Sequence, residues 1–270
     1  MKKITFLIVS ILLFTTCDKK QSDNKQTLTC SFTTPTNNTK IYNNVEINLT
    51  VTTSRSVKKV EFYLDGILIG TVITEPYSIK WTPLNIDAGN HKLSCIAIPL
   101  EGEDATNEIS VLVELKLGDS FKGGKIFFID ETLKHGLIAS TTDITLNNNS
   151  TFFWGSHNLI GASDINSGKN NTTKMATASF SSDYAGYAFK NGYESNGFND
   201  WYIPAQEQLK LLKENQDYVG GFSTQSSNAS YWSSTELSFD KAFALNFAAL
   251  MGTSVTKGVF SYRIRPIRDF

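Results

Sequence analysis

The sequence predicts a multidomain chain in which an N-terminal all-β sandwich is followed by an α+β domain. The chain has 270 residues, which is a comfortable length for two domains. Short alternating apolar runs with turn signals fill the segment up to residue 115. From residue 118 onward, glycine-introduced hairpins and a helix that starts at a proline replace that pattern. No long Pro- or Ser-rich linker separates the two parts.

The charge balance argues against a nucleic-acid partner. The formal net charge is -1, with 25 Lys and Arg against 26 Asp and Glu, so no basic surface is indicated. Charged residues make up only 19% of the chain, while Asn, Ser, Thr and aromatic residues are plentiful. This composition is typical of β-rich extracellular modules.

The first residues predict export. Two lysines precede an apolar run over residues 4–14, which is too short to span a bilayer but suits the core of a signal peptide. The run leads to Cys17, and residues 18–26 are polar. This arrangement resembles a bacterial lipoprotein signal, which implies that residues 1–17 are the signal, ending at a lipidated Cys17, and that residues 18–26 are a tether. The alternative is an ordinary cleaved signal peptide in which Cys17 is incidental.

Lipidation would set the localisation and one partner. Several acyl chains on Cys17 would anchor the exported chain firmly to the membrane of the bacterial cell envelope. We expect the outer membrane, with the body of the protein facing either the periplasm or the cell surface. The sequence leaves that choice open.

Export also permits a disulfide. Cys30 and Cys95 each alternate with apolar neighbours, so each side chain is expected to point inward from its own strand. One interpretation is a bridge between two facing sheets. The other is a pair of buried thiols that act as small apolar side chains.

The segment 27–116 carries the strand signals. Apolar residues alternate over residues 45–51 and again over residues 60–64. Asp65-Gly66 then separates the second run from residues 67–70. Asp-Gly between two apolar runs predicts a hairpin, because both turn positions need positive φ.

Three landmarks in this segment carry a family resemblance. They are Val60-Glu61-Phe62-Tyr63-Leu64-Asp65-Gly66, Pro76-Tyr77 with Trp81, and Ala88-Gly89-Asn90-His91. With them, residues 27–116 resemble the bacterial immunoglobulin-like domains, in which the module is usually a spacer or stalk. Trp81 is a candidate for stacking on a ligand, but packing within or between the sheets is the expected role of a single strand tryptophan.

Residues 117–270 mix strands with helices. Pro204 predicts a helix start, because a proline in the first turn has no backbone N–H to lose, and Leu209 and Leu212 give this helix an apolar face. The other expected elements are a hairpin of residues 125–130 and 137–140, a short helix at 184–189, a strand at 242–247, a turn at Met251-Gly252 and a closing strand at 262–268.

A series of landmarks runs through this second segment. It includes Gly123-Gly124-Lys125, His135, Trp154-Gly155, Asp200, Trp201, Pro204, Trp232, Glu236 and Arg263-Ile264-Arg265. In this order they make residues 117–270 similar to the Lcl C-terminal domain, a bacterial family long filed as a domain of unknown function. The resemblance implies a fold related to C-type lectins. It also implies a secreted or surface protein, and some members are implicated in binding glycans such as glycosaminoglycans.

One residue departs from the family pattern. Ala205 stands where the family usually has a serine as the helix cap. Loss of that hydroxyl is expected to cost the helix about 1 kcal/mol.

The candidate catalytic residues do not predict an enzyme. His135 has no evident nucleophile or carboxylate partner, so a turn histidine bonded to backbone is expected. The formylglycine-generating enzymes have a related fold and act through cysteine, but no cysteine follows Cys95. Asp200, Glu207 and Glu236 could pair as glycosidase carboxylates. We instead expect Asp200 to be a buried carboxylate that ties a loop, and Glu207 to be a first-turn helix residue. No catalytic residue is predicted.

Aromatic residues among Asn- and Ser-rich loops favour binding. Trp154 offers a flat face to a sugar, whereas Trp201 and Trp232 are expected in the core. The loops at 147–150 and 164–171 are expected to form the rim of a ligand site. The candidate rim residues are Asn149, Asp164, Asn166 and Asn171.

Two arginines near the C-terminus add a further candidate. Arg263 and Arg265 share one face of the predicted closing strand and could grip an acidic glycan. The other interpretation, which the near-neutral charge favours, is a set of carboxylate-paired arginines that closes the fold.

No metal site or cofactor is predicted, and no histidine or cysteine spacing resembles a zinc site. Oxygen-rich loops could still coordinate calcium. The residues in question are Asp143, Asp164, Asn166 and Asp183. They lack EF-hand spacing, so calcium is a minor hypothesis.

Together these patterns predict a lipoprotein that acts as a non-enzymatic binding or adhesion module. In fold class it is a multidomain chain, with an N-terminal immunoglobulin-like sandwich followed by an α+β C-type-lectin-like domain. The expected partner is a glycan, or an envelope or host protein. The main alternative is a structural envelope-assembly lipoprotein that binds a protein, and a glycan-processing enzyme is the third hypothesis.

Overall fold

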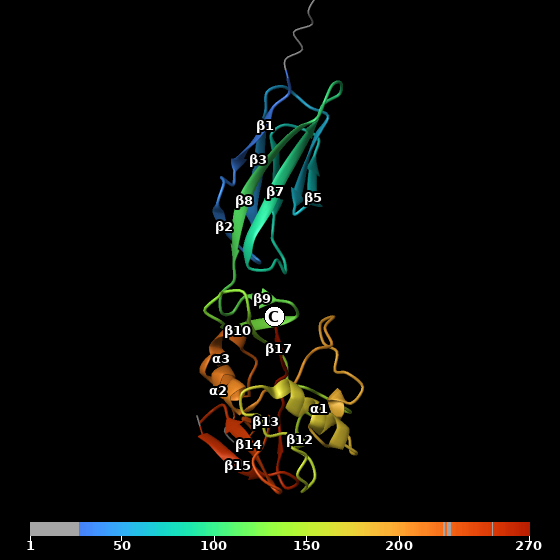
Figure 1. The fold of residues 1–270 in the computed structure, drawn as a ribbon, viewed down its shortest axis with the longest axis vertical. Helices are drawn as coiled ribbons and strands as arrows, with labels where there is room; N and C mark the ends of the chain where they lie inside the picture. Colours follow the sequence, from blue (N-terminus) through green and yellow to red (C-terminus); the bar gives the residue numbers. More distant parts are fainter. Residues whose placement is uncertain (1–26, 224, 226–227, 250) are drawn as a thin grey trace, which may run out of the picture.

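The computed structural model describes residues 27–223, 225, 228–249 and 251–270. Cys17, and with it the predicted lipid anchor and tether, lies outside these residues. A β-sandwich of residues 27–116, the N-terminal region, stands at one end of an elongated molecule (Figure 1). Residues 117–270, the C-terminal region, form the other end, and the C-terminus lies near the junction (Figure 1). No helix in the described part of the chain is long and apolar enough to cross a membrane.

Two sheets enclose the core of the N-terminal region. One has the strand order β2-β8-β7-β4-β5 and the other the order β1-β3-β6. Neighbouring strands are antiparallel, except for the parallel pair β2 and β8. The strands are β1 (Cys30–Thr34), β2 (Thr39–Tyr42), β3 (Ile47–Thr53), β4 (Lys59–Leu64), β5 (Ile67–Val72), β6 (Tyr77–Trp81), β7 (Gly89–Ile98) and β8 (Ala105–Glu114).

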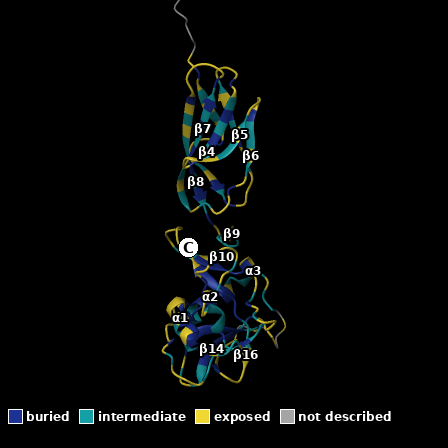
Figure 2. Ribbon diagram, turned by 90° about the vertical axis from the view of Figure 1, so that its right-hand side faces the viewer, coloured by how far each residue is buried: buried dark blue, intermediate teal, exposed yellow. Residues whose placement is uncertain are grey.

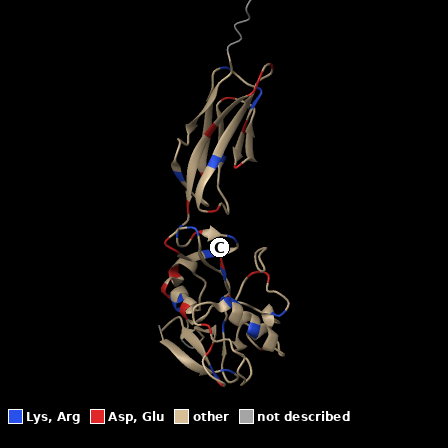
Figure 3. Ribbon diagram, in the orientation of Figure 1, with Lys and Arg blue, Asp and Glu red and all other residues tan. Residues whose placement is uncertain are grey.

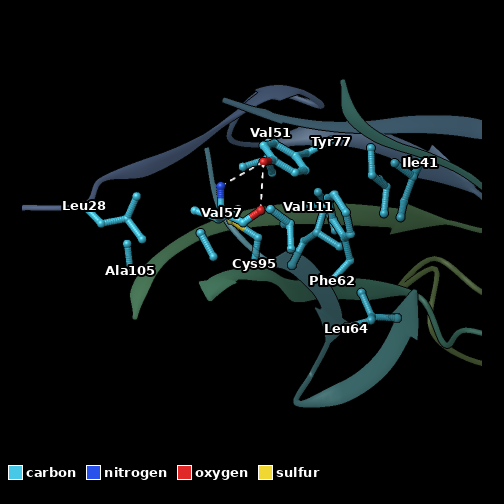
Figure 4. Close-up of a cluster of buried hydrophobic side chains, with 14 of the residues drawn as sticks. Leu28, Ile41, Val51, Val57, Phe62, Leu64, Tyr77, Cys95, Ala105 and Val111 are labelled. Carbon is cyan, nitrogen blue, oxygen red and sulfur yellow. Dashed lines mark hydrogen bonds between the residues drawn. The ribbon is translucent and has the colours of Figure 1, made fainter. Parts of the chain in front are cut away.

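The core between these sheets is apolar. Buried residues alternate with less buried ones along β3 and β4 (Figure 2), because successive side chains point to opposite faces. Leu49 and Phe62 are fully buried, and Trp81 packs against the same cluster, as predicted. The Tyr77 hydroxyl finds partners inside the core (Figure 4): it accepts from the Val57 N–H at 3.0 Å and donates to the Val57 carbonyl at 3.2 Å.

The predicted hairpin at Asp65-Gly66 is confirmed. Strands β4 and β5 pair antiparallel on either side of it. Asp65 has φ 48° and Gly66 has φ 82°, the positive values that this turn requires.

In its described residues, the C-terminal region has three small sheets, in the orders β17-β11-β10-β9, β13-β14-β15 and β12-β16. The predicted hairpin is β10 and β11, and the strand predicted at 242–247 is β14. The strands are β9 (Ser120–Phe121), β10 (Gly124–Ile129), β11 (Gly136–Ala139), β12 (Phe152–Phe153), β13 (Ser230–Glu236), β14 (Lys241–Asn246), β15 (Met251–Thr256), β16 (Ser261–Tyr262) and β17 (Ile267–Asp269).

Two strand predictions in this region are wrong. The closing strand at 262–268 is divided between β16 and β17, because Pro266 has no N–H to donate to a sheet and the chain changes partner there, from β12 to β11. Met251 and Gly252 begin strand β15 and do not form a turn. A glycine suits position 252, because a Cβ there would lie 2.6 Å from the ring of Phe243.

The helices also differ from the prediction. They are α1 (Gly168–Ala178), the 3-10 helix η1 (Tyr187–Phe189), α2 (Gln206–Glu214) and α3 (Gln216–Val219). Only the end of the helix predicted at 184–189 forms, and the end of the loop predicted at 164–171 belongs to α1. Weak helix formers, Asn and Thr, hide α1 in the sequence. Tertiary packing compensates for them, since α1 buries Asn171, Thr172, Met175 and Ala176 on one face.

Helix α2 begins after its N-cap Ala205, which confirms the predicted cap position, whereas Pro204 precedes the first turn and is not part of it. Tertiary partners replace the missing serine. The Glu207 N–H, one of the groups that a serine cap can satisfy, donates to the Ile165 carbonyl at 2.8 Å. The Gln206 N–H donates to Oγ1 of Thr235 at 2.9 Å. The predicted loss of about 1 kcal/mol is therefore offset by these partners.

The two regions are joined by polar contacts as well as by the chain. Nδ2 of Asn44 donates to the Ser120 carbonyl at 2.8 Å. The backbone N–H of Lys122 donates to Oδ1 of Asn85 at 2.7 Å, and its Nζ lies 2.6 Å from Oδ1 of Asp87. These contacts seat β9 and its flanking turn against the loops at the end of the sandwich.

Candidate binding site

A concave pocket of about 480 Å³ opens on the C-terminal region between α1 and the segment 189–202. This volume lies in the range that holds small ligands. The lining residues are Lys169, Thr172, Thr173, Ala176, Thr177, Phe189, Lys190, Gly192, Tyr193, Asn199, Asp200, Trp201 and Tyr202.

Helix α1 supplies one wall. Lys169, Thr173 and Thr177 lie four residues apart, so they share the exposed face of the helix, opposite its buried stripe. Oγ1 of Thr173 donates to the Lys169 carbonyl at 3.3 Å, and Oγ1 of Thr177 donates to the Thr173 carbonyl at 2.9 Å. Each hydroxyl oxygen keeps lone pairs with which it can accept from a ligand.

Aromatic side chains form the facing wall. The rings of Phe189 and Tyr193 pack with their centroids 5.4 Å apart. Burial raises the pKa of Tyr193, so its hydroxyl stays protonated at neutral pH. The Trp201 indole is buried and donates from Nε1 to the Ser195 carbonyl at 3.0 Å, which fixes the segment that follows Tyr193.

An ion pair at the pocket edge holds Asp200 in place. Nε and Nη2 of Arg268 lie 2.7 and 2.9 Å from the two carboxylate oxygens of Asp200. Burial would raise the pKa of Asp200, but the bonds from Arg268 outweigh burial and lower it. The Arg268 guanidinium also covers the Phe198 ring at 4.0 Å and donates to the Lys122 carbonyl at 2.7 Å. Asp200 ties its loop as predicted, but it is exposed and not buried.

The pocket therefore combines hydroxyl groups, an amide, aromatic faces and two lysines. Lys190 donates to the Ser179 carbonyl at 3.2 Å, while Lys169 is exposed at the start of α1. Hydrogen-bonding groups beside aromatic faces suit a polar ligand with apolar patches, such as a sugar. With Asp200 neutralised by Arg268, the lysines favour an anionic ligand.

The prediction that Trp154 stacks on a ligand is wrong. Trp154 is 2% exposed, and its Nε1 donates to the Ser233 carbonyl at 2.8 Å. Nζ of Lys257 lies 4.7 Å from the centre of its ring. An indole enclosed on all sides packs the core and leaves no face for a ligand.

Arg265 and Arg263 also do not face a ligand. Arg265 is fully buried: its Nε lies 2.8 Å from Oδ1 of Asp143, and its other nitrogens donate to the Ser140, Gly220 and Gly221 carbonyls. Nη1 of Arg263 lies 3.2 Å from Oδ2 of Asp143. The alternative interpretation, carboxylate-paired arginines that close the fold, is the one that the structure shows.

The predicted rim residues are not part of this pocket. Asn149 is exposed in a tight turn and exchanges backbone hydrogen bonds with Leu146. Oδ1 of Asp164 accepts from the N–H groups of Asn166 and Ser167, ahead of α1. Asn171 is buried and bonds the backbone of Asp164 through both of its side-chain polar atoms. Asp164 and Asn171 are thus supports of the fold, and Asn166 lines a different cavity.

The calcium hypothesis gains no support from the donor set. Asp143 is paired with arginines, Asp164 accepts from backbone N–H groups, and Asp183 accepts from Ser181. In the part of the chain that the structure describes, no group of three or more His, Cys, Asp or Glu side chains could hold a metal ion.

The remaining landmarks are mainly structural. Trp201 and Trp232 are buried as predicted, and Pro204 is buried just before α2. Nε1 of Trp232 donates to the Phe152 carbonyl at 2.7 Å. His135 is exposed, and its Nδ1 lies 3.3 Å from Oδ2 of Asp130, so its side chain pairs with a carboxylate and not with the predicted backbone group.

The three candidate glycosidase carboxylates each have their own cation. Asp200 pairs with Arg268, and Glu207, in the first turn of α2 as predicted, pairs with Lys210. Glu236 pairs with Lys257 at 2.7 Å inside the core. Each of the three carboxylates is therefore held in an ion pair with a cation of this chain.

The two cysteines come together from opposite sheets. Sγ of Cys30 on β1 and Sγ of Cys95 on β7 are 3.8 Å apart, and the thiols are not bridged. The structure confirms that they face each other across the core, and the disulfide itself stays a prediction.

Sequence reasoning missed most of the pocket. Tyr193 and Lys190 follow no recognisable motif. The available signal was the spacing of Lys169, Thr173 and Thr177, which repeats every four residues, as one face of a helix does. This spacing was missed because residues 164–171, which include Lys169, were predicted to form a loop.

Residues 29–94 match the bacterial Ig domain family. The N-terminal region is an immunoglobulin-like domain. No curated protein matches the chain.

Similar solved structures are distant. A fibronectin(III)-like module of CbhA from Clostridium thermocellum is 27% identical, with 31% of this chain and 94% of that chain covered and a TM-score of 0.28. A fimbrial protein from Bacteroides ovatus is 15% identical, with 85% of this chain and 68% of that chain covered and a TM-score of 0.39.

Proposed function

We propose that this protein is a non-enzymatic binding module of the bacterial cell envelope, with a glycan as its ligand. The observation that carries this proposal is the pocket between α1 and residues 189–202, where hydroxyl groups and lysines stand beside aromatic rings. The carboxylates that hydrolysis would need are engaged in ion pairs, which supports binding over catalysis.

The immunoglobulin-like region would be the spacer. It precedes the C-terminal region along an elongated molecule, so it would separate the pocket from an anchor at Cys17 (Figure 1). The sequence landmarks support an Lcl C-terminal-like, C-type-lectin-like assignment for residues 117–270. Acidic and basic residues are interspersed along the ribbon of both regions (Figure 3).

A glycan array tests the ligand. The chain from Thr27 to Phe270 would be applied with and without calcium, and saturable binding to one class of sugar is expected. Tyr193→Ala should weaken that binding about fivefold, since an aromatic contact contributes roughly 1 kcal/mol. Lys169→Ala should act mainly on anionic sugars, and Lys58→Ala, an exposed lysine of the sandwich, is the matched control.

The outcomes separate the functions. A folded chain that binds no sugar would favour the alternative, a protein partner in envelope assembly. Sugar binding that is unchanged in Tyr193→Ala and Lys169→Ala would move the site elsewhere. For the anchor, Cys17→Ser should shift the full chain from the membrane fraction to the soluble fraction.

A further inference from the structure

A second cavity, of about 490 Å³, lies between helix α2 and strands β10, β11 and β17. It shares no lining residue with the pocket described above. We call it the α2 cavity. Its walls come from segments far apart in the sequence, so no local sequence motif predicts the cavity.

The floor of the α2 cavity is apolar. It is formed by Phe128, Leu137, Leu211 and Phe270. Phe128 follows a register shift in the β10–β11 ladder and is 37% exposed, whereas its neighbour Phe127 is fully buried. A ligand that covers apolar side chains in a concave site of this size removes them from water, and this burial favours binding.

Gly136 allows the residues of this floor to pack closely. A Cβ at this position would lie 2.1 Å from the Phe128 carbonyl oxygen and 2.7 Å from the ring of Phe270. A side chain is therefore excluded where β11 passes beneath Phe270. The glycine therefore leaves the space that the ring of Phe270 occupies next to β11.

The rim is acidic. The charged side chains that line the cavity are the carboxylates of Asp130, Glu207 and Asp269, and His135 is the other titratable group. Bonding from Thr132 lowers the pKa of Asp130, and bonding from Lys210 lowers the pKa of Glu207, so both are ionised at neutral pH.

In two of these carboxylates, Asp269 and Glu207, one of the two oxygens is hydrogen-bonded within the protein. The Tyr202 hydroxyl donates to Oδ1 of Asp269 at 2.6 Å, and Lys210 and Gln206 both bond Oε1 of Glu207. Among the residues that the structure describes, the second oxygen of each carboxylate has no hydrogen-bond partner, so it can accept from a ligand. Carboxylates only accept, so the complementary ligand group is a donor, and a cationic donor makes the stronger, charge-assisted bond.

We propose that the α2 cavity binds a primary ammonium group carried on an apolar body. The body covers the phenylalanine and leucine floor, and the ammonium reaches Asp269 and Glu207 at the rim. An anionic ligand would be repelled by the carboxylates of Asp130 and Asp269, while Glu207 shares its charge with Lys210. An uncharged donor could bond a carboxylate but would leave its charge uncompensated. The ammonium could belong to a free aromatic amine or to the lysine side chain of a peptide.

Calorimetric titration at pH 7.5 with three matched probes tests this proposal. Tyramine carries the ammonium, 4-ethylphenol is its uncharged analogue, and 3-(4-hydroxyphenyl)propionate is its anionic analogue. Tyramine should bind saturably and at least tenfold more tightly than either analogue, and more weakly as salt is added. Equal affinity for the three probes, or no binding of tyramine, would overturn the proposal.

Variants assign the site. Asp269→Asn keeps the acceptor that Tyr202 bonds, and Glu207→Gln keeps the amide oxygen for Lys210, so both should fold. Each should weaken tyramine at least fivefold, while Asp217→Asn, on the exposed first turn of α3, should not. Unchanged affinity in the double variant Asp269→Asn/Glu207→Gln would refute the site.

A final comparison distinguishes a free amine from a peptide lysine as the source of the ammonium group. The peptide N-acetyl-Phe-Lys-amide is compared with the same peptide carrying norleucine for lysine. Binding of the lysine peptide more tightly than tyramine indicates a protein segment as the ligand, and tighter binding of tyramine indicates a free amine. Variants in the other pocket, such as Tyr193→Ala, should leave all these affinities unchanged.

Discussion

The two regions are stabilised in different ways. The N-terminal region has one apolar core between two sheets, and of its described residues Asn43 is the buried polar one. The C-terminal region buries many polar and charged side chains, among them Glu236, Lys257, Arg265 and Gln208. Its sheets are short, and its loops are held by side-chain bonds where a longer sheet would use its ladder.

This difference shows how irregular backbone becomes rigid. Nζ of Lys257 bonds Glu236 and the carbonyls of Asn158 and Phe239, and Glu236 in turn accepts from the N–H groups of Ile160 and Gly161. One buried pair thus ties several loops together. Such pairs are costly to break, because a single charge left in the core has no water to solvate it.

The largest effect is expected from breaking that pair. Lys257→Met should destabilise the protein by about 3–5 kcal/mol, because Glu236 would remain buried without its cation. Urea unfolding with hydrogen exchange should place the loss in the C-terminal region and leave β3 and β4 protected.

A rescue variant sharpens this result. Lys257→Met/Glu236→Leu removes both charges and should recover part of the loss. Equal destabilisation of both regions by Lys257→Met would show that they unfold as one unit, and the contrast drawn above would fail.

Oxidation should act on the other region. The hydrogen bond from Cys95 lowers the pKa of Cys30, so Cys30 is the thiolate that attacks when oxidised glutathione is added. A bridge across 65 residues should stabilise the sandwich by about 2–4 kcal/mol.

Measurement is by urea midpoint with and without reductant. Cys30→Ser/Cys95→Ser should show no such difference, and the C-terminal region should be unaffected in either case. Two alkylated thiols in protein isolated from its native envelope would contradict the bridge.

Lowering the pH should destabilise the C-terminal region, with a smaller effect than the substitutions and the oxidation above. Burial would raise the pKa of Glu236, but Lys257 and the two N–H groups outweigh burial and lower it. A lowered folded pKa means that this stabilisation is complete above the ordinary value of 4.5 and is lost as the pH falls below it. Stability at pH 7 and at pH 4 should therefore differ less in Lys257→Met/Glu236→Leu than in the wild type.

The smallest effect is expected at the junction. Asp87→Ala removes an exposed partner of Lys122, so the free energy of unfolding should change by less than about 1 kcal/mol. Amide exchange near Phe198 and Asp200 should nevertheless rise, because the Lys122 carbonyl holds Arg268, which holds Asp200. Glu46→Ala, which breaks the exposed pair with Lys80, is the control. Identical exchange in both variants would show that the sandwich does not steady the pocket.

The sequence predicted the N-terminal region better than the C-terminal one. Alternation located the inward faces of β3 and β4, and Asp65-Gly66 located β5, the hairpin partner of β4. A period of two and a turn of fixed φ are local properties of the chain. In the C-terminal region the same reasoning found β10, β11 and the start of α2 but missed α1.

The candidate site could be predicted only in part. Trp154 and Arg265 were chosen for their chemistry, and both proved to be buried supports, because burial depends on what packs over a side chain. The sequence did not predict that Lys169 and Tyr193 line the same pocket, because they lie on separate segments that only the packing of α1 brings together.

The sequence by itself therefore determined the strand pattern of the sandwich, the inward direction of Cys30 and Cys95, and the place where α2 begins. Those features follow from local backbone preference and side-chain period. The tertiary structure alone decided which charges are buried and where the two cavities form. The physical reason is that a buried ion pair or a concave surface depends on contacts between distant segments, and such contacts have no local signature.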